Sequence, residues 1–150
     1  MSRTDRAVEA FAREFSCSQS VFSAFADSAR LDRETALRVA AGFGGGLARS
    51  GETCGAVAGA VLALGLARCG TPADDPTAKE AAYPPVREFL ARFRALHGSL
   101  QCRELLGVDL STPDGLRQAR EQGLIRSRCP DLVRDAARIL EALIPEAGRP

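Results

Sequence analysis

The feature that most constrains the fold is a run of twelve residues, Ala56–Ala67, that is apolar on nearly every face of a helix and is interrupted only by glycines. A helix without a polar face needs other elements to bury it on all sides. The run is also far shorter than the roughly 20 residues that a helix needs to cross a bilayer. It therefore predicts a buried central helix, rich in Gly and Ala, over about residues 55–68, and no membrane span.

The rest of the chain also has helical periodicity. Ala, Leu, Arg and Glu are abundant, whereas alternating runs of Val, Ile, Thr and Tyr are absent. Apolar side chains at helical spacing indicate amphipathic helices within residues 8–15, 21–26, 37–43, 86–96 and 132–143. Shorter helices are expected at 100–106 and 113–121. A length of 150 residues fits one domain. The sequence thus predicts a compact, all-α, single-domain helical bundle over residues 1–150.

The charge balance excludes one class of partner. The chain has 20 basic and 19 acidic residues, a net charge of +1, so we expect no nucleic-acid partner. Residues 1–14 are rich in charge and lack the apolar segment of a secretory signal, which predicts a cytoplasmic protein. Structural disulfides are rare in that compartment, so the five cysteines need another explanation.

The first two cysteines follow helix-capping residues. Ser16 and Gln19 have the spacing of a capping box, which makes Ser16 the N-cap and Cys17 the first helical residue. Thr53 precedes the apolar run and is the expected N-cap of the central helix. Cys54 would then be the first residue of that helix.

The next cysteines fit the same pattern, with one exception. A helix restarting at Ser99 puts Cys102 in its first turn. Pro130 is typical of a first helical position, which makes Cys129 an N-cap. Cys69 differs, because it precedes Gly70 at the C-terminal end of the central helix. Four cysteines are therefore predicted to lie at helix N-termini and one is not.

A helix N-terminus changes the chemistry of a thiol. Its unpaired N–H groups and positive dipole end stabilise a thiolate, the form that acts as a nucleophile or a metal ligand. For any single cysteine, packing as a small apolar residue is the commoner case. Chance is a weaker explanation for four cysteines at the same unusual position. Thiolates from four helices can converge in a bundle core, and four Cys ligands are typical of iron–sulfur clusters.

The spacing of the cysteines weighs against two other kinds of site. The sequence has no C-x-x-C pair, so a thioredoxin-type dithiol and a zinc knuckle both lack their usual motif. His97 is the only histidine and could complete a metal site, although a histidine in the last turn of a helix more often interacts with the helix dipole. The cluster Arg117, Arg120, Arg126 and Arg128 near Cys129 is by default solvated, but it could also steer an anionic partner.

Glycines form two further patterns. Gly55 and Gly59 share one face of the central helix. They would allow either a close approach of another helix or contact with a bulky cofactor, and the first is the commoner reason. Gly44–Gly46 lacks the Gly-Lys-Ser/Thr and the preceding strand of a phosphate-binding loop, so a tight turn towards Cys54 is the better interpretation.

These features together resemble the C-GCAxxG-C-C family of redox-active proteins. The resemblance covers about residues 15–143, and its core is the Cys-Gly-Ala-x-x-Gly motif that starts at Cys54. The matching stretches are Phe15–Val21, Gly42–Gly46, Gly51–Ala60, Leu64–Leu66, Phe93, His97-Gly98, Cys102–Gly107 and Cys129-Pro130.

The resemblance implies a small bacterial or archaeal protein whose functional cysteines are Cys17, Cys54, Cys102 and Cys129. Cys69 lies outside the pattern. Family membership implies either a prosthetic group such as an iron–sulfur cluster or direct redox chemistry of the thiols. Some relatives carry a twin-arginine export signal, which we do not find here.

Three hypotheses follow. The first is electron transfer or redox sensing through an iron–sulfur cluster held by the four family cysteines, with Gly55 and Gly59 beside it and a redox protein as partner. The second is a metal-free thiol–disulfide protein. The third is a structural zinc protein or a binding module of a transport or oxidoreductase system. The sequence leaves open the electron partner and whether the protein forms a homodimer.

Overall fold

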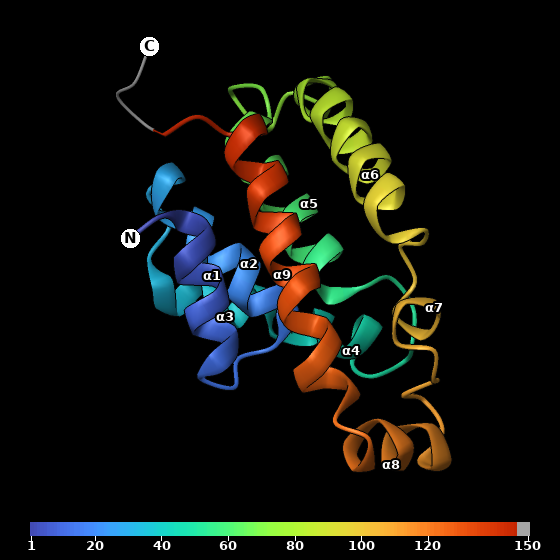
Figure 1. Ribbon diagram of the computed structural model, residues 1–150. Helices are drawn as coiled ribbons and strands as arrows, with labels where there is room; N and C mark the ends of the chain where they lie inside the picture. Colours follow the sequence, from blue (N-terminus) through green and yellow to red (C-terminus); the bar gives the residue numbers. More distant parts are fainter. Residues whose placement is uncertain (147–150) are drawn as a thin grey trace.

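The computed structural model describes residues 1–146, and within them the regular structure is helical apart from one isolated bridge between Thr53 and Gln101 (Figure 1). The all-α prediction is therefore confirmed. The α-helices are α1 (Arg3–Ala12), α2 (Cys17–Ala26), α3 (Arg33–Ala40), α4 (Gly44–Leu47), α5 (Gly55–Arg68), α6 (Tyr83–His97), α7 (Cys102–Leu106), α8 (Pro113–Glu121) and α9 (Leu124–Leu143). Short 3₁₀ turns cover Asp27–Ala29, Ala41–Phe43 and Ala78–Ala81.

Helix α5 is the buried centre, as its apolar run predicts. It packs against α2, α6 and α9, and α9 in turn runs beside α1 (Figure 1). Its residues Val57 and Leu64 are almost completely buried, together with Phe89 and Phe93 of α6 and Val133 of α9. In the described part of the chain, no helix is both long and apolar enough to span a membrane.

The N-terminal helices start where the sequence supplies a cap. Ser2 with Asp5, and Ser16 with Gln19, each form a complete capping box, so α2 begins at Cys17 as predicted. Arg3 then ties the two ends of the described chain together. Its guanidinium donates to the carbonyl of Ile144 at 2.5 Å.

A second, smaller core lies under the C-terminal helices. It joins α7, the segment after it, α8 and α9, and it contains two of the family cysteines. Its buried members are Cys102, Leu106, Leu110, Ala119 and Cys129. This part of the molecule is therefore organised around cysteines as well as aliphatic side chains.

The predicted start of the last helix was wrong. Helix α9 begins at Leu124, after Gly123 in the left-handed conformation, so Cys129 lies inside the helix instead of at its N-cap. Pro130 is also an interior residue, where it removes one backbone hydrogen bond to the carbonyl of Arg126. Packing of α9 along α1, α5 and α6 outweighs that local cost.

Two other helix starts differ from the prediction by one or two residues. Cys54, not Thr53, is the N-cap of α5, because Thr53 forms the isolated bridge with Gln101. Gln101 in turn is the N-cap of α7, which makes Cys102 the first residue of that helix and not its third.

Candidate functional site

The four family cysteines line one cavity of about 850 Å³. Cys17 and Cys102 are the first residues of α2 and α7, and Cys54 caps α5. Cys129 comes from the first half of α9. Cys54, Cys102 and Cys129 are buried, and Cys17 is half-buried. The cavity thus collects thiols from four helices that are far apart in the sequence.

Cys54 and Cys102 are brought together by paired backbone segments. The backbone N–H of Cys54 donates to the carbonyl of Leu100 at 2.8 Å, and that of Cys102 donates to the carbonyl of Glu52 at 2.7 Å. These bonds flank the isolated bridge and fix one segment against the other. Backbone hydrogen bonds therefore hold these two thiols in position.

Burial, not helix position, dominates the acidity of two of these thiols. It raises the pKa of Cys54 to about 11 and that of Cys102 to about 12, because a thiolate loses hydration in an apolar site. The backbone N–H groups of Val57 and Ala56 favour the Cys54 thiolate, but they offset only part of the increase in pKa that burial causes. The expectation that helix N-termini would lower these pKa values was therefore wrong.

The thiols of Cys17 and Cys129 affect each other's acidity. Their interaction lowers the pKa of Cys129 and, together with burial, raises that of Cys17 well above its usual range.

The sulfur atoms are not gathered as tightly as ligands of a single ion. Within residues 1–146 there is no group of three or more His, Cys, Asp or Glu side chains positioned to hold one metal ion.

One wall of the cavity is a left-handed turn. Five consecutive residues, 45–49, have φ between 51° and 71°. Gly45, Ala48 and Arg49 of this segment line the cavity, as does Gly44 before it. The turn is closed by backbone bonds, including Glu52 N–H to the carbonyl of Gly46 at 3.0 Å. Gly44–Gly46 therefore forms a tight turn leading to Cys54, as predicted, although it is more irregular than a simple helix end.

The glycines of α5 lie against α2. A Cβ atom on Gly59 would come within 2.6 Å of the carbonyl oxygen of Ser18, and one on Gly55 within 3.1 Å of the Ser18 nitrogen. Close helix approach is thus the geometry seen at both positions. Gly55 also lines the cavity, whereas Gly59 does not, so only Gly55 could touch a group bound there.

The cavity has an apolar wall that the cysteine pattern did not reveal. Phe11 and Phe15 come from α1 and the segment after it, Leu105 from α7, and Ile125 from α9. All four are half-buried. The helical stripe through Phe11 and Phe15 is visible in the sequence, but such a stripe normally indicates a core and not a ligand site.

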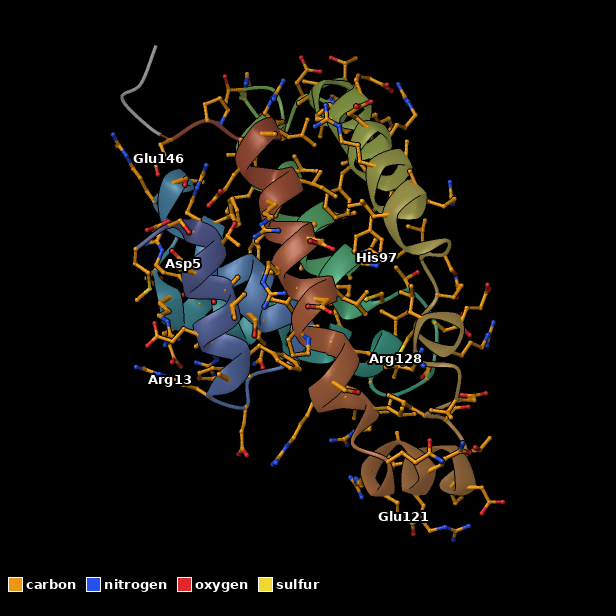
Figure 2. The ribbon with its side chains drawn as sticks, viewed as in Figure 1. Asp5, Arg13, His97, Glu121, Arg128 and Glu146 are labelled. Carbon is orange, nitrogen blue, oxygen red and sulfur yellow. The ribbon has the colours of Figure 1, made fainter. Side chains whose placement is uncertain are left out.

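His97 and Cys69 both lie outside the cavity lining. His97, in the last turn of α6, has its Nε2 3.0 Å from a carboxylate oxygen of Asp135 on α9 (Figure 2). Cys69 caps the far end of α5 and is half-buried. Of the arginines near Cys129, Arg126 lines the cavity, and Arg128 instead donates to the carbonyl of Leu105 at 3.2 Å.

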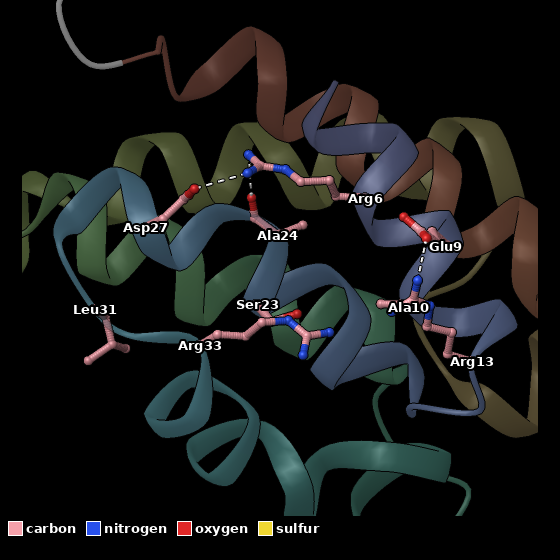
Figure 3. Close-up of a pocket in the computed structure, with 9 residues that line it drawn as sticks. All are labelled: Arg6, Glu9, Ala10, Arg13, Ser23, Ala24, Asp27, Leu31 and Arg33. Atoms are coloured by element: carbon pink, nitrogen blue, oxygen red, sulfur yellow. Dashed lines mark hydrogen bonds and ion pairs between the residues drawn. The ribbon is translucent and has the colours of Figure 1, made fainter. Parts of the chain in front are cut away.

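A second, smaller cavity of about 260 Å³ lies between α1, α2 and the start of α3 (Figure 3). Two of its three arginines are paired with carboxylates, Arg6 with Asp27 at 3.0 Å and Arg13 with Glu9 at 2.8 Å, and Arg33 lies over the ring of Phe15, 5.3 Å from its centroid. No cysteine lines it. We therefore place the candidate site at the larger cavity.

Comparison with known proteins identifies the family of the chain. Residues 15–143 match the family model described as "Putative redox-active protein (C_GCAxxG_C_C)". Because the match spans most of the chain, the protein belongs to this redox-active family. Neither the curated proteins nor the solved structures contain a match to the chain.

Proposed function

We propose that this member of the C_GCAxxG_C_C family is an electron-transfer or redox-sensing protein whose four cavity cysteines hold an iron–sulfur cluster. The observation that carries the proposal is that thiols from four separate helices line one cavity. Iron–sulfur clusters take four Cys thiolates as ligands. Bound there, a cluster would supply one-electron transfer. The ligands would be Cys17, Cys54, Cys102 and Cys129.

The surroundings of the thiols suit such a group. Backbone N–H groups of Ala56 and Val57 stabilise negative charge on Cys54, and hydrogen bonds to ligand sulfur tune the potential of a cluster. The apolar side chains of Phe11 and Leu106 in the lining limit contact with water. The backbone pairing that fixes Cys54 and Cys102 provides two of the ligand positions in advance.

The raised pKa values predict how binding of the cluster depends on pH. Cys54 and Cys102 keep their protons at neutral pH when nothing is bound, since their pKa values are about 11 and 12. Ligand thiols must be deprotonated, so binding would release protons and become tighter as the pH rises.

The test is to purify the protein without oxygen and to measure visible absorption, iron and acid-labile sulfide. We expect a coloured protein with iron and sulfide, and loss of both when any one of the four family cysteines is changed to Ser. We also expect a chelator-stripped sample to melt at a lower temperature while staying partly folded, because the chain is long enough to bury its own core. Zinc in place of iron would support a structural zinc site, and a colourless, metal-free protein would contradict the proposal.

One observation favours a second candidate function, metal-free disulfide exchange. Cys17 and Cys129 line the same cavity, and the interaction between their thiols lowers the pKa of Cys129. A disulfide would form when both thiols lose their protons and two electrons pass to an oxidant of the disulfide class.

Trapping free thiols after equilibration in glutathione buffers tests this candidate. Mass spectrometry of the digested protein should then find a peptide that links Cys17 to Cys129 and leaves Cys69 alkylated. Iron in the isolated protein and free thiols at every redox poise would contradict it. The two candidate functions thus predict different results for the same purified sample. The first predicts iron and sulfide, and the second predicts a metal-free protein with a disulfide between Cys17 and Cys129.

A further inference from the structure

The cavity is much larger than the thiols alone require. Its volume of about 850 Å³ lies in the range of roughly 300–1,000 Å³ that is typical of small-molecule sites. A group held by the four cysteines occupies only the space among their sulfur atoms. The remaining space extends along α1, α4 and the beginning of α9.

Half-buried apolar side chains line that remaining space. Phe11, Phe15, Ile125 and Leu105 each keep part of their surface uncovered by the protein. An apolar lining with a few polar groups is the usual composition of a pocket that binds an organic molecule. These side chains would cover the apolar body of a ligand.

Two arginines without an ion-pair partner contribute positive charge to the cavity. Arg49 follows α4 and Arg126 lies in the first turn of α9, and both line the cavity and are exposed. Across residues 1–146, neither has an ion-pair partner or a side-chain hydrogen bond. Glu14 is the single acidic residue in the lining.

Two arginines of the smaller cavity differ from Arg49 and Arg126 in this respect. There, Arg6 and Arg13 are each held by a carboxylate at 3.0 Å or less. Arg49 and Arg126 instead leave their donors available at the mouth of an apolar space. Guanidinium groups prefer carboxylate and phosphate partners.

We propose that the cavity binds a small organic anion, with its apolar body against Phe11, Phe15 and Ile125. Its acidic group lies at Arg49 and Arg126. The proposal concerns binding alone and does not rest on the function proposed above. The protein would then have an anion-binding pocket next to its thiols.

The charge of the ligand is tested with two probes of the same shape, 1-naphthaleneacetate and 1-naphthaleneacetamide, by titration calorimetry on the protein as isolated. The anion should bind more tightly than the neutral amide. The double variant Arg49→Gln/Arg126→Gln should weaken binding of the anion about tenfold and leave the amide unchanged. Arg120→Gln is the matched control, because Arg120 is exposed on α8 and outside the cavity. Equal affinity for both probes, or the same loss in the control, would overturn the proposal.

The place of the apolar body is tested by filling the cavity. Ile125→Trp should abolish binding of both probes, whereas Leu96→Trp, at a side chain 62% exposed on α6, should not. Thermal unfolding of both variants shows whether they are folded. Unchanged binding to folded Ile125→Trp would contradict the proposal.

The chelator-stripped protein separates this proposal from the iron–sulfur assignment. Both the isolated and the stripped forms should bind the naphthalene anion. If the anion bound to the stripped protein but not to the isolated, metal-containing protein, the cavity would serve the metal group alone. That result would overturn the proposed pocket. Absence of iron would instead overturn the cluster and leave the pocket standing.

Discussion

Gly59 of α5 lies directly against the backbone of Ser18 in α2, so closely that a Cβ atom would come 2.6 Å from the Ser18 carbonyl oxygen. Ser18 is completely buried, and its hydroxyl donates to the carbonyl of Ala40 at 2.9 Å. It cannot move away without breaking that bond. This contact sets the distance between α2 and α5, the helices that begin next to Cys17 and Cys54.

A matched pair of substitutions in α5 tests this contact. Gly59→Ala should lower the free energy of unfolding by about 1–3 kcal/mol, because the methyl group forces the helices apart. Gly65→Ala should raise it by up to about 1 kcal/mol, because a Cβ atom there meets nothing within 4 Å and alanine favours the helix. Urea unfolding of both variants measures the difference. Equal effects of the two substitutions would show that the helix contact is not tight.

The left-handed turn beside the cavity gives a second prediction. Gly46 has a φ of 71°, and a Cβ atom there would lie 2.7 Å from the Cβ of Cys102 and 2.6 Å from the nitrogen of Glu52. Gly46→Ala should therefore destabilise the protein by at least about 2 kcal/mol. Because it also displaces Cys102, it should reduce iron binding.

The control for that substitution is a nearby glycine. Gly42 precedes the turn, and a Cβ atom there has no neighbour within 4 Å. Gly42→Ala should change the free energy of unfolding by no more than about 1 kcal/mol and leave the metal content intact. A stable Gly46→Ala variant with full metal content would show that the turn does not position Cys102.

The sequence predicts the helices better than it predicts the site. The run 56–67 identifies α5 because an apolar helix can only be central, and the capping box at Ser16 gives the start of α2 to the residue. The position of Cys129 was missed because the proline rule is local, whereas the start of α9 depends on packing against helices far away in the sequence.

The environment of the thiols could not be predicted either. Cys54 and Cys102 meet through backbone bonds between segments that no sequence pattern connects. Their pKa values follow burial, which is a property of the assembled cavity and not of the first helical turn. The family motif therefore selects the four cysteines but says little about their surroundings.

The raised thiol pKa values predict a loss of stability at alkaline pH. In metal-free protein, Cys54 and Cys102 hold their protons up to about pH 11 and 12, whereas an unfolded chain releases them near the ordinary value of 9.0. The contribution of the two protonated thiols to the free energy of unfolding is complete below pH 9. It is lost as the pH rises from there towards 11 and 12. The slope approaches about 1.4 kcal/mol per pH unit for each thiol.

Urea unfolding of the metal-free protein between pH 8 and pH 11 measures this slope. The variants Cys54→Ala and Cys102→Ala should each make it less steep, because each removes one thiol that the native state keeps protonated. Their absolute stability can fall through lost packing, but the pH dependence reports the proton alone. A slope that is the same in wild type and in both variants would contradict the assignment.

The last prediction separates the two kinds of cysteine. Cys69 lies at the opposite end of α5 from Cys54, fifteen positions along the chain, which corresponds to about 22 Å at 1.5 Å per residue. It also lies outside the cavity lining. Cys69→Ser should therefore leave iron content, visible absorption and probe binding unchanged. Cys129→Ser should remove the absorption, because it deletes a proposed ligand in the cavity lining.

The two Ser variants make the same chemical change, so each is the control for the other. Circular dichroism establishes that both remain helical. If Cys69→Ser lost its colour while Cys129→Ser kept it, the ligand set would be wrong. In that case the redox chemistry would have to be sought at the far end of α5, where Cys69 is half-buried and Arg68 donates to the carbonyl of Leu143 at 2.9 Å.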